Sequence, residues 1–125
     1  MSNILIVENH KDFREAVKNF ILTKGVKVNI LEAISGEQGI DIASREHPKI
    51  VILDIHLGIG INGLEAASII KRQDPACGII ILTMYSIEGI KNLCKTKDVS
   101  DFIDKSDLDI RLIPSINRLL TIQSP

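Results

Sequence analysis

Short runs of branched apolar residues alternate along the chain with longer segments of helical periodicity. Four such runs contain only Ile, Val, Leu or Phe: Ile4–Val7, Ile50–Leu53, Ile79–Leu82 and the weaker Phe102–Ile103. Continuous apolar runs of this length are typical of strands that are buried on both faces of a parallel sheet. The segment Val26–Ile34 instead begins with alternating apolar and polar residues, which predicts a half-exposed edge strand.

The segments that follow these runs carry apolar residues at helical spacing. They predict helices over five ranges: Asp12–Leu22, Ser35–Arg45, Leu64–Arg72, Ser86–Cys94 and Asp107–Ile122. Pro114 lies inside the last range, so this helix either begins near Pro114 or has a distorted first turn.

A strand followed by a helix therefore occurs five times. Each crossover helix must return the chain to the same edge of the sheet, so the order predicts an α/β fold with a doubly wound, five-stranded parallel sheet, (βα)5. The 125 residues contain no linker, repeat or low-complexity tract, and we expect a single domain over residues 1–125.

Composition narrows the classes of function. The net charge of −1 argues against a nucleic-acid or membrane surface that depends on bulk charge, and Lys91, Lys95 and Lys97 form only a small basic patch. No apolar run reaches the roughly 18 residues of a membrane span, and the N-terminus lacks the pattern of a secretory signal, so we expect a cytoplasmic protein. Cys77 and Cys94 lack metal-ligand spacing and are expected to be buried, reduced thiols.

Polar residues of complementary chemistry end the buried strands. Glu8 and Asn9 follow the first strand, Asp54 the third and Thr83 the fourth, and Lys105 comes near the end of the fifth. Each has an ordinary structural role when taken alone, as a helix cap, a turn residue or a solvated lysine. Because the carboxyl ends of parallel strands share one edge, where ligands bind, together they indicate a site. Two neighbouring carboxylates repel, and a divalent cation and Lys105 are the expected compensators.

The motifs, in this order, resemble the receiver domains of two-component response regulators over nearly the whole chain. The resemblance rests on five segments: ILIVENHKDFREAVKNFI, VILDIHL, NGLEAASIIK, IILTMYS and DFIDKSD. NGLEA and LTMYS are most similar to receivers that carry a C-terminal helix-turn-helix output domain. The resemblance implies the flavodoxin-like receiver fold and a phosphorylation-dependent signalling switch that is not an enzyme.

The resemblance also implies roles for the residues at the sheet edge. Asp54 would accept a phosphoryl group, and Lys105 and Thr83 would bind it, so these three are the catalytic candidates. Thr83 and Phe102 would be the switch residues, moving together to remodel the face formed by the fourth helix, the fifth strand and the fifth helix. Mg²⁺ would be held by a set of four residues: Glu8, Asn9, Asp54 and the backbone carbonyl of His56.

The implied partners are a histidine kinase or a phosphotransfer protein. Phosphorylation in this family often shifts a weak dimer equilibrium, so a homodimer is a further candidate. No direct contact of this chain with nucleic acid or with a membrane is expected.

Three features depart from the family pattern. Asn9 stands where the family usually has the Asp that touches the metal, so Mg²⁺ binding is expected to be weak. The loop after Asp54 has one additional residue and two glycines, Gly58 and Gly60, and the third departure is Pro114. Asn9 and the loop leave a second hypothesis open, a pseudo-receiver that keeps the fold and the output face without Mg²⁺-dependent phosphorylation.

A third class, an enzyme or redox carrier on this architecture, is disfavoured by the first strand and its loop. The loop ENHKDF has no glycine to cradle the phosphate of a flavin. An aspartyl-phosphate hydrolase would need its nucleophilic Asp on the first strand, where this chain has Glu8.

Overall fold

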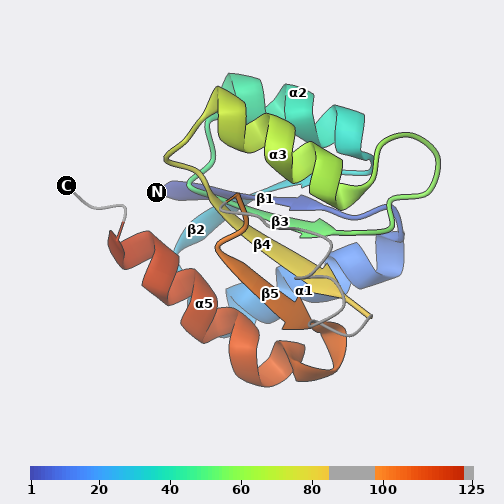
Figure 1. The fold of residues 1–125 in the computed structure, drawn as a ribbon. Coiled ribbons are helices and arrows are strands. Elements are labelled where there is room, and N and C mark those ends of the chain that lie inside the picture. Colours follow the sequence, from blue (N-terminus) through green and yellow to red (C-terminus); the bar gives the residue numbers. More distant parts are fainter. Residues whose placement is uncertain (85–97, 123–125) are drawn as a thin grey trace.

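The computed structural model describes residues 1–84 and 98–122. Strands and helices alternate along it (Figure 1): β1 (Ser2–Val7), α1 (Lys11–Thr23), β2 (Val28–Ala33), α2 (Gly36–Glu46), β3 (Ile50–Asp54), α3 (Gly63–Gln73), β4 (Gly78–Thr83), β5 (Asp101–Asp104), the 3₁₀ helix η1 (Lys105–Asp107) and α5 (Leu108–Ile122). The predicted helix over 86–94 and the lysine patch of Lys91, Lys95 and Lys97 lie outside the described residues.

The five strands form one parallel sheet in the order β2-β1-β3-β4-β5. Helices α2 and α3 cover one face of this sheet, and α1 and α5 cover the other (Figure 1). This confirms the predicted doubly wound α/β fold. It also confirms the edge strand expected over Val26–Ile34, which the structure places at Val28–Ala33.

Alternate residues of each inner strand enter two separate cores. In β1, Leu5 and Val7 join the cluster under α2 and α3, whereas Ile4 and Ile6 join the cluster under α1 and α5. Both faces of the strand are therefore buried, which is why its apolar run is continuous rather than alternating. The interior of the sheet is consequently apolar, and the polar side chains lie at the edge where the strands end.

Helix α5 begins at Leu108, close to the predicted start at Asp107, so a start near Pro114, one of the two alternatives left open, is excluded. Proline has no N–H to donate to the carbonyl of Ile110, one turn earlier. Both residues lie on the exposed side of the helix, where water can hydrogen-bond that carbonyl. The opposite side packs Leu112, Ile116 and Leu119 into the core, and this packing carries the helix through the proline.

No helix among the residues that the structure describes is long and apolar enough to cross a lipid bilayer.

Gly63 lets α3 begin directly against the end of β3. Its N–H donates to the carbonyl of Ile55 at 2.8 Å, and a Cβ at this position would collide with the carbonyl oxygen of Asp54. The side chain of Asn62 caps the helix by accepting from Glu65 N at 2.9 Å, within a capping box. The sequence around NGLE thus fixes the backbone just beyond Asp54.

We expect Gly63→Ala to lower the free energy of unfolding by more than about 2 kcal/mol, because backbone must shift to admit the methyl group. Gly25→Ala is the matched control. Gly25 has a φ of +81°, but a methyl group added there would meet no atom within 4 Å, so this variant should lose only about 1 kcal/mol through backbone strain. Chemical denaturation of both variants gives the comparison, and equal losses would contradict the proposed collision.

Candidate functional site

The carboxyl edge of the sheet carries an unusual concentration of buried polar side chains. Glu8, Asp54 and Thr83 are 2%, 7% and 0% exposed at the ends of β1, β3 and β4. In the described ranges, only Ser115 in α5 joins them as a buried polar or charged residue. The predicted convergence is therefore present, since residues more than 70 positions apart in the sequence meet at one edge.

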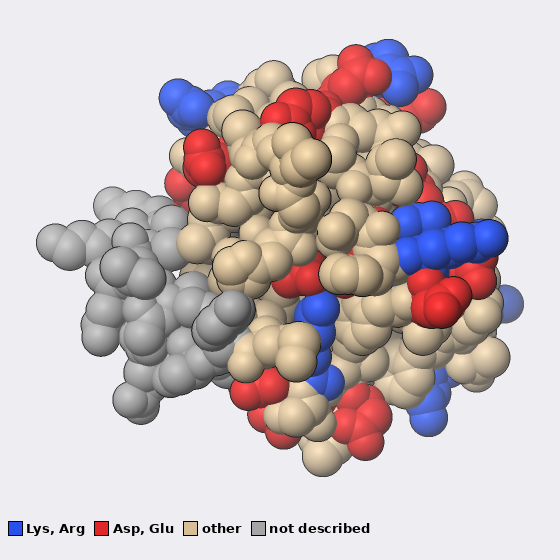
Figure 2. Space-filling view, turned by 90° about the vertical axis from the view of Figure 1, so that its right-hand side faces the viewer, with Lys and Arg blue, Asp and Glu red and all other residues tan. Residues whose placement is uncertain are grey.

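Lys105, the first residue after β5, joins the two carboxylates. Its Nζ lies 2.9 Å from Asp54 Oδ2 and 3.4 Å from Glu8 Oε1. One positive charge thus bridges two buried negative charges whose repulsion would otherwise oppose folding of this edge. Figure 2 views the molecule from this side and shows acidic and basic atoms in contact within a hollow of the surface.

The hollow is an open pocket of about 410 Å³ lined by His10, Asp54, His56, Met84 and Lys105. Its floor is polar, because Asp54 and Lys105 meet there. The volume exceeds that of several water molecules, at about 30 Å³ each, so a hydrated phosphoryl group fits. The carboxylate of Asp54 is consequently buried by its neighbours yet reachable from one side.

Phe13 of α1 lies beneath the lysine. The Nζ of Lys105 is 4.2 Å from the centroid of the Phe13 ring, within the range of a cation–π interaction. Sequence reasoning missed this contact, because the apolar periodicity of the helix accounts for Phe13 fully. The sequence signal for this contact is an aromatic residue in the first turn of the helix that follows Glu8 and Asn9.

Each carboxylate oxygen of the pair has a donor from the chain. Lys105 serves Asp54 Oδ2 and Glu8 Oε1. The backbone N–H of His56 donates to Asp54 Oδ1 at 3.3 Å, and that of His10 donates to Glu8 Oε2 at 3.3 Å. The imidazole Nδ1 of His10 also lies 3.5 Å from Glu8 Oε2 and forms an ion pair when it is protonated.

Asn9 is exposed and directs one end of its amide at two acceptors, the backbone carbonyl of His56 and Glu8 Oε2. Since neither acceptor can donate, the amide nitrogen belongs at this end. In that orientation it donates to the His56 carbonyl at 3.3 Å and to Glu8 Oε2 at 3.0 Å. In this orientation Asn9 is a hydrogen-bond donor, whereas the opposite orientation places its amide oxygen beside the oxygens of Glu8 and His56.

The loop after β3 is tied to α2. Gly58 and Gly60 have φ values of +79° and +104°, and Ile59 between them is 98% exposed. Glu37, in the first turn of α2, accepts a hydrogen bond from Ile61 N at 3.0 Å. The positive φ values account for the glycines at both positions. The restraint by Glu37 depends on the path of the loop and gave no signal in the sequence.

The two predicted switch residues lie on neighbouring strands. Thr83 ends β4 in register with Asp104 of β5, while Phe102 pairs with Ile81. Phe102 is buried in the cluster under α2 and α3. Thr83 thus lies at the carboxyl end of β4, and Phe102 lies on the strand that pairs with it.

The site offers oxygen ligands for a hard cation. The carboxylates of Glu8 and Asp54, the carbonyl of His56 and the amide oxygen of Asn9, once rotated inward, are of the kind that Mg²⁺ prefers. Within residues 1–84 and 98–122, no group of three or more His, Cys, Asp or Glu side chains is suited to a metal. The donor set fits Mg²⁺, with one carboxylate fewer because of Asn9.

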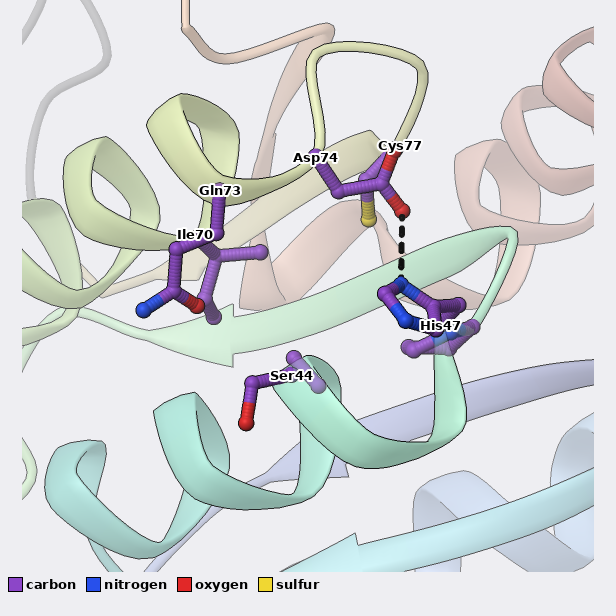
Figure 3. A pocket seen from close by; sticks show the side chains of 8 residues that line it. Ser44, His47, Ile70, Gln73, Asp74 and Cys77 are labelled. Atoms are coloured by element: carbon purple, nitrogen blue, oxygen red, sulfur yellow. Dashed lines mark ion pairs between the residues drawn. The ribbon is translucent and has the colours of Figure 1, made fainter.

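A second pocket lies at the opposite end of the sheet, between α2 and the turn before β4 (Figure 3). His47 Nδ1 and Asp74 Oδ2 are 3.8 Å apart across it. Burial, helped by the charge of Asp74, raises the pKa of the Cys77 thiol to about 12. Cys77 is free and buried as predicted, whereas Cys94 lies outside the described residues. A protonated thiol is a poor nucleophile, so Cys77 offers no activated thiolate to this pocket.

The fold and the polar edge define an α/β domain of the flavodoxin-like class, and comparison with known proteins gives its family. The profile of the response regulator receiver domain matches residues 4–117. The chain belongs to this family, the phosphorylation-dependent signalling domains of two-component systems, and the resemblance seen in its motifs is confirmed.

Individual relatives agree. The transcriptional regulatory protein YdfI of Bacillus subtilis is 35% identical over 96 residues, 73% of this chain and 44% of that protein. The response regulator TrrA of Thermotoga maritima, solved in complex with Mg²⁺-BeF, is 28% identical with a TM-score of 0.85, covering 95% of this chain and 99% of that one. A LuxR-family response regulator from Aurantimonas sp. has the same fold, with a TM-score of 0.86, 24% identity and coverage of 97% and 86%.

The chain spans less than half of the length of such curated relatives, with shares from 26% to 45%. The match therefore concerns the receiver domain, and the relatives carry further domains beyond it.

We expect Cys77 to resist thiol reagents in the folded protein. A rise in its pKa from 9.0 to about 12 lowers the thiolate fraction at pH 8 about a thousandfold. The measurement is the labelling rate of a Cys94→Ser variant by a chromogenic disulfide, with the same variant in denaturant as control. Labelling of the folded variant at the denatured rate would contradict this expectation.

A double-mutant cycle tests the contact between Phe13 and Lys105. Phe13→Leu keeps an apolar side chain but removes the ring, and Lys105→Met removes the charge but keeps the stem. We expect a coupling free energy of about 0.5–1 kcal/mol between the two changes in denaturant unfolding. Phe20→Leu, on the same helix, provides the control cycle and should be additive with Lys105→Met. Additivity in both cycles would remove the cation–π contact from the description of the site.

Proposed function

We propose that this domain is a phosphorylatable receiver in which Asp54 accepts a phosphoryl group from a histidine kinase or a phosphotransfer protein. The observation that carries the proposal is the bridge from Lys105 to Asp54 and Glu8, at 2.9 and 3.4 Å. A lysine held against a nucleophilic carboxylate in an open pocket is ready to bind the phosphate oxygens as they arrive. Family membership supports the same role.

In the proposed transfer, the phosphoryl group moves from an imidazole of the donor to the carboxylate of Asp54. A carboxylate oxygen of Asp54 attacks phosphorus, the bond from phosphorus to the imidazole nitrogen of the donor breaks, and the electron pair stays on that nitrogen, which takes a proton. Lys105 Nζ exchanges part of its contact with Asp54 Oδ2 for a phosphate oxygen and holds it as a point charge. A bound Mg²⁺ would supply further neutralisation of the developing charge.

The output would pass through Thr83 and Phe102. The hydroxyl of Thr83, at the end of β4, would donate to a phosphate oxygen and move towards it. Phe102, on the adjacent strand, would change position in step, because the two strands pair directly. The affected face would comprise the predicted helix over 86–94, β5 and α5. A second copy of the domain or an output domain would bind to this face.

The alternative is a pseudo-receiver, and Asn9 is the observation that favours it. A unit charge near 4 Å is worth roughly 4 kcal/mol at an effective dielectric of about 20. The smaller repulsion in the cation-free site offsets part of this loss. A net loss of roughly 2 kcal/mol would still weaken Mg²⁺ binding more than tenfold. On this view the domain binds partners through its output face without Mg²⁺-dependent phosphorylation.

Treatment with a small acyl phosphate donor separates the two proposals. We expect the wild-type protein to gain the mass of one phosphoryl group, because Asp54 faces the pocket beside Lys105. The gain should depend on Mg²⁺ and be absent in Asp54→Asn. Intact mass spectrometry with and without Mg²⁺ is the measurement, with Asp104→Asn as a control that also removes one carboxylate, at the end of β5 where it caps η1.

A gain in Asn9→Asp but none in the wild type would replace the first proposal by the pseudo-receiver. A gain that survives in Asp54→Asn would contradict the assignment of the acceptor.

A further inference from the structure

The carboxylates of Glu8 and Asp54 already have hydrogen-bond donors within the chain, so a cation would add little further compensation of their charge. The four oxygens of Glu8 and Asp54 accept from Lys105, from the backbone N–H groups of His10 and His56, and from Asn9. The carbonyl of His56, a family metal ligand by resemblance, accepts from Asn9 as well. Each group that the cation would contact therefore already has a partner within the chain.

Asn9 occupies the bridging position. Its amide nitrogen joins Glu8 Oε2 at the end of β1 to the carbonyl of His56 in the loop after β3, at 3.0 and 3.3 Å. A carboxylate at this position has only acceptors when ionised. It would repel both Glu8 Oε2 and the carbonyl oxygen, and only a bound cation could compensate the repulsion among the three oxygens. An amide, by contrast, can donate to both acceptors when no metal is bound.

The surroundings hold the loop where the amide needs it. Gly58 places its backbone against the other end of the Asn9 amide, so close that a Cβ added to the glycine would lie 3.3 Å from that amide. Glu37 restrains the loop further along through Ile61 N. The position of the His56 carbonyl thus does not depend on the amide alone.

We propose that the side-chain amide of Asn9 takes the place of the cation in the metal-free domain, and that Mg²⁺ binds only when this amide rotates to present its oxygen. The inference rests on the proposed function for the identity of the cation site. Mg²⁺ affinity is lowered for two reasons, since a charge is absent and two hydrogen bonds must break. The same bonds stabilise the domain without metal.

The test compares four proteins in chelating buffer and across a Mg²⁺ titration: the wild type, Asn9→Ala, Asn9→Asp and Asn29→Asp. Asn29→Asp adds the same charge on an exposed position at the far end of β2. In chelator, the melting temperature should fall from the wild type to Asn9→Ala and further to Asn9→Asp, by about 4 °C or more in total. Asn29→Asp should match the wild type.

With Mg²⁺, Asn9→Asp should bind at least about tenfold more tightly than the wild type by calorimetry and recover its melting temperature. The side-chain amide resonance of Asn9, identified by its loss in Asn9→Ala, should shift as the wild type binds Mg²⁺. Equal melting temperatures of wild type and Asn9→Ala in chelator would overturn the inference. So would equal Mg²⁺ affinities of wild type and Asn9→Asp.

These readouts do not require phosphorylation. Failure of the phosphodonor experiment with the expected order of stabilities would overturn the proposed function and leave the role of Asn9 intact. Successful phosphorylation with an unaltered Asn9→Ala melting temperature would do the reverse.

Discussion

Repulsion between two buried carboxylates is the constraint around which this molecule is arranged. Glu8 and Asp54 end adjacent strands and are almost fully buried, so both need compensation from inside the protein. Lys105 provides it from the end of β5, two strands away from β3 in the sheet order. Its stem must cross the end of β4 and lie over Phe13 to do so. The positions of α1, β1, β3 and β5 are thus coupled through one ammonium group.

The same constraint explains the division between core and edge. The inner strands are apolar on both faces, which leaves the strand ends as the place where polar groups can meet. The backbone just beyond Asp54 is fixed by Gly63 and the capping box of α3. Rigid strands and a defined turn therefore present the carboxylate.

The sequence predicts this site well because its geometry follows from topology. Parallel strands bring their ends together, so the meeting of Glu8, Asp54, Thr83 and Lys105 needs only the order of elements. Contacts that depend on side-chain direction or loop path escaped prediction, as with Phe13 beneath Lys105 and Glu37 on Ile61. The predicted range Asp107–Ile122 is close to the observed α5, and the alternative of a start near Pro114 fails because packing of the buried side outweighs the local effect of this proline.

Asn9 shows why identical folds can differ in function. The exchange of a carboxylate for an amide hardly changes shape, yet it converts an acceptor facing two acceptors into a donor that satisfies both. In a site with three carboxylates, a bound cation would relieve more repulsion than it does here, so metal-free and metal-bound states would differ more in electrostatic energy. With the amide, the energy difference between the metal-free and the metal-bound state becomes smaller. The metal-free state gains two hydrogen bonds, and the metal-bound state loses one negative charge next to the cation. On the two proposals above, a receiver and a pseudo-receiver of this architecture differ in the size of that energy difference rather than in fold.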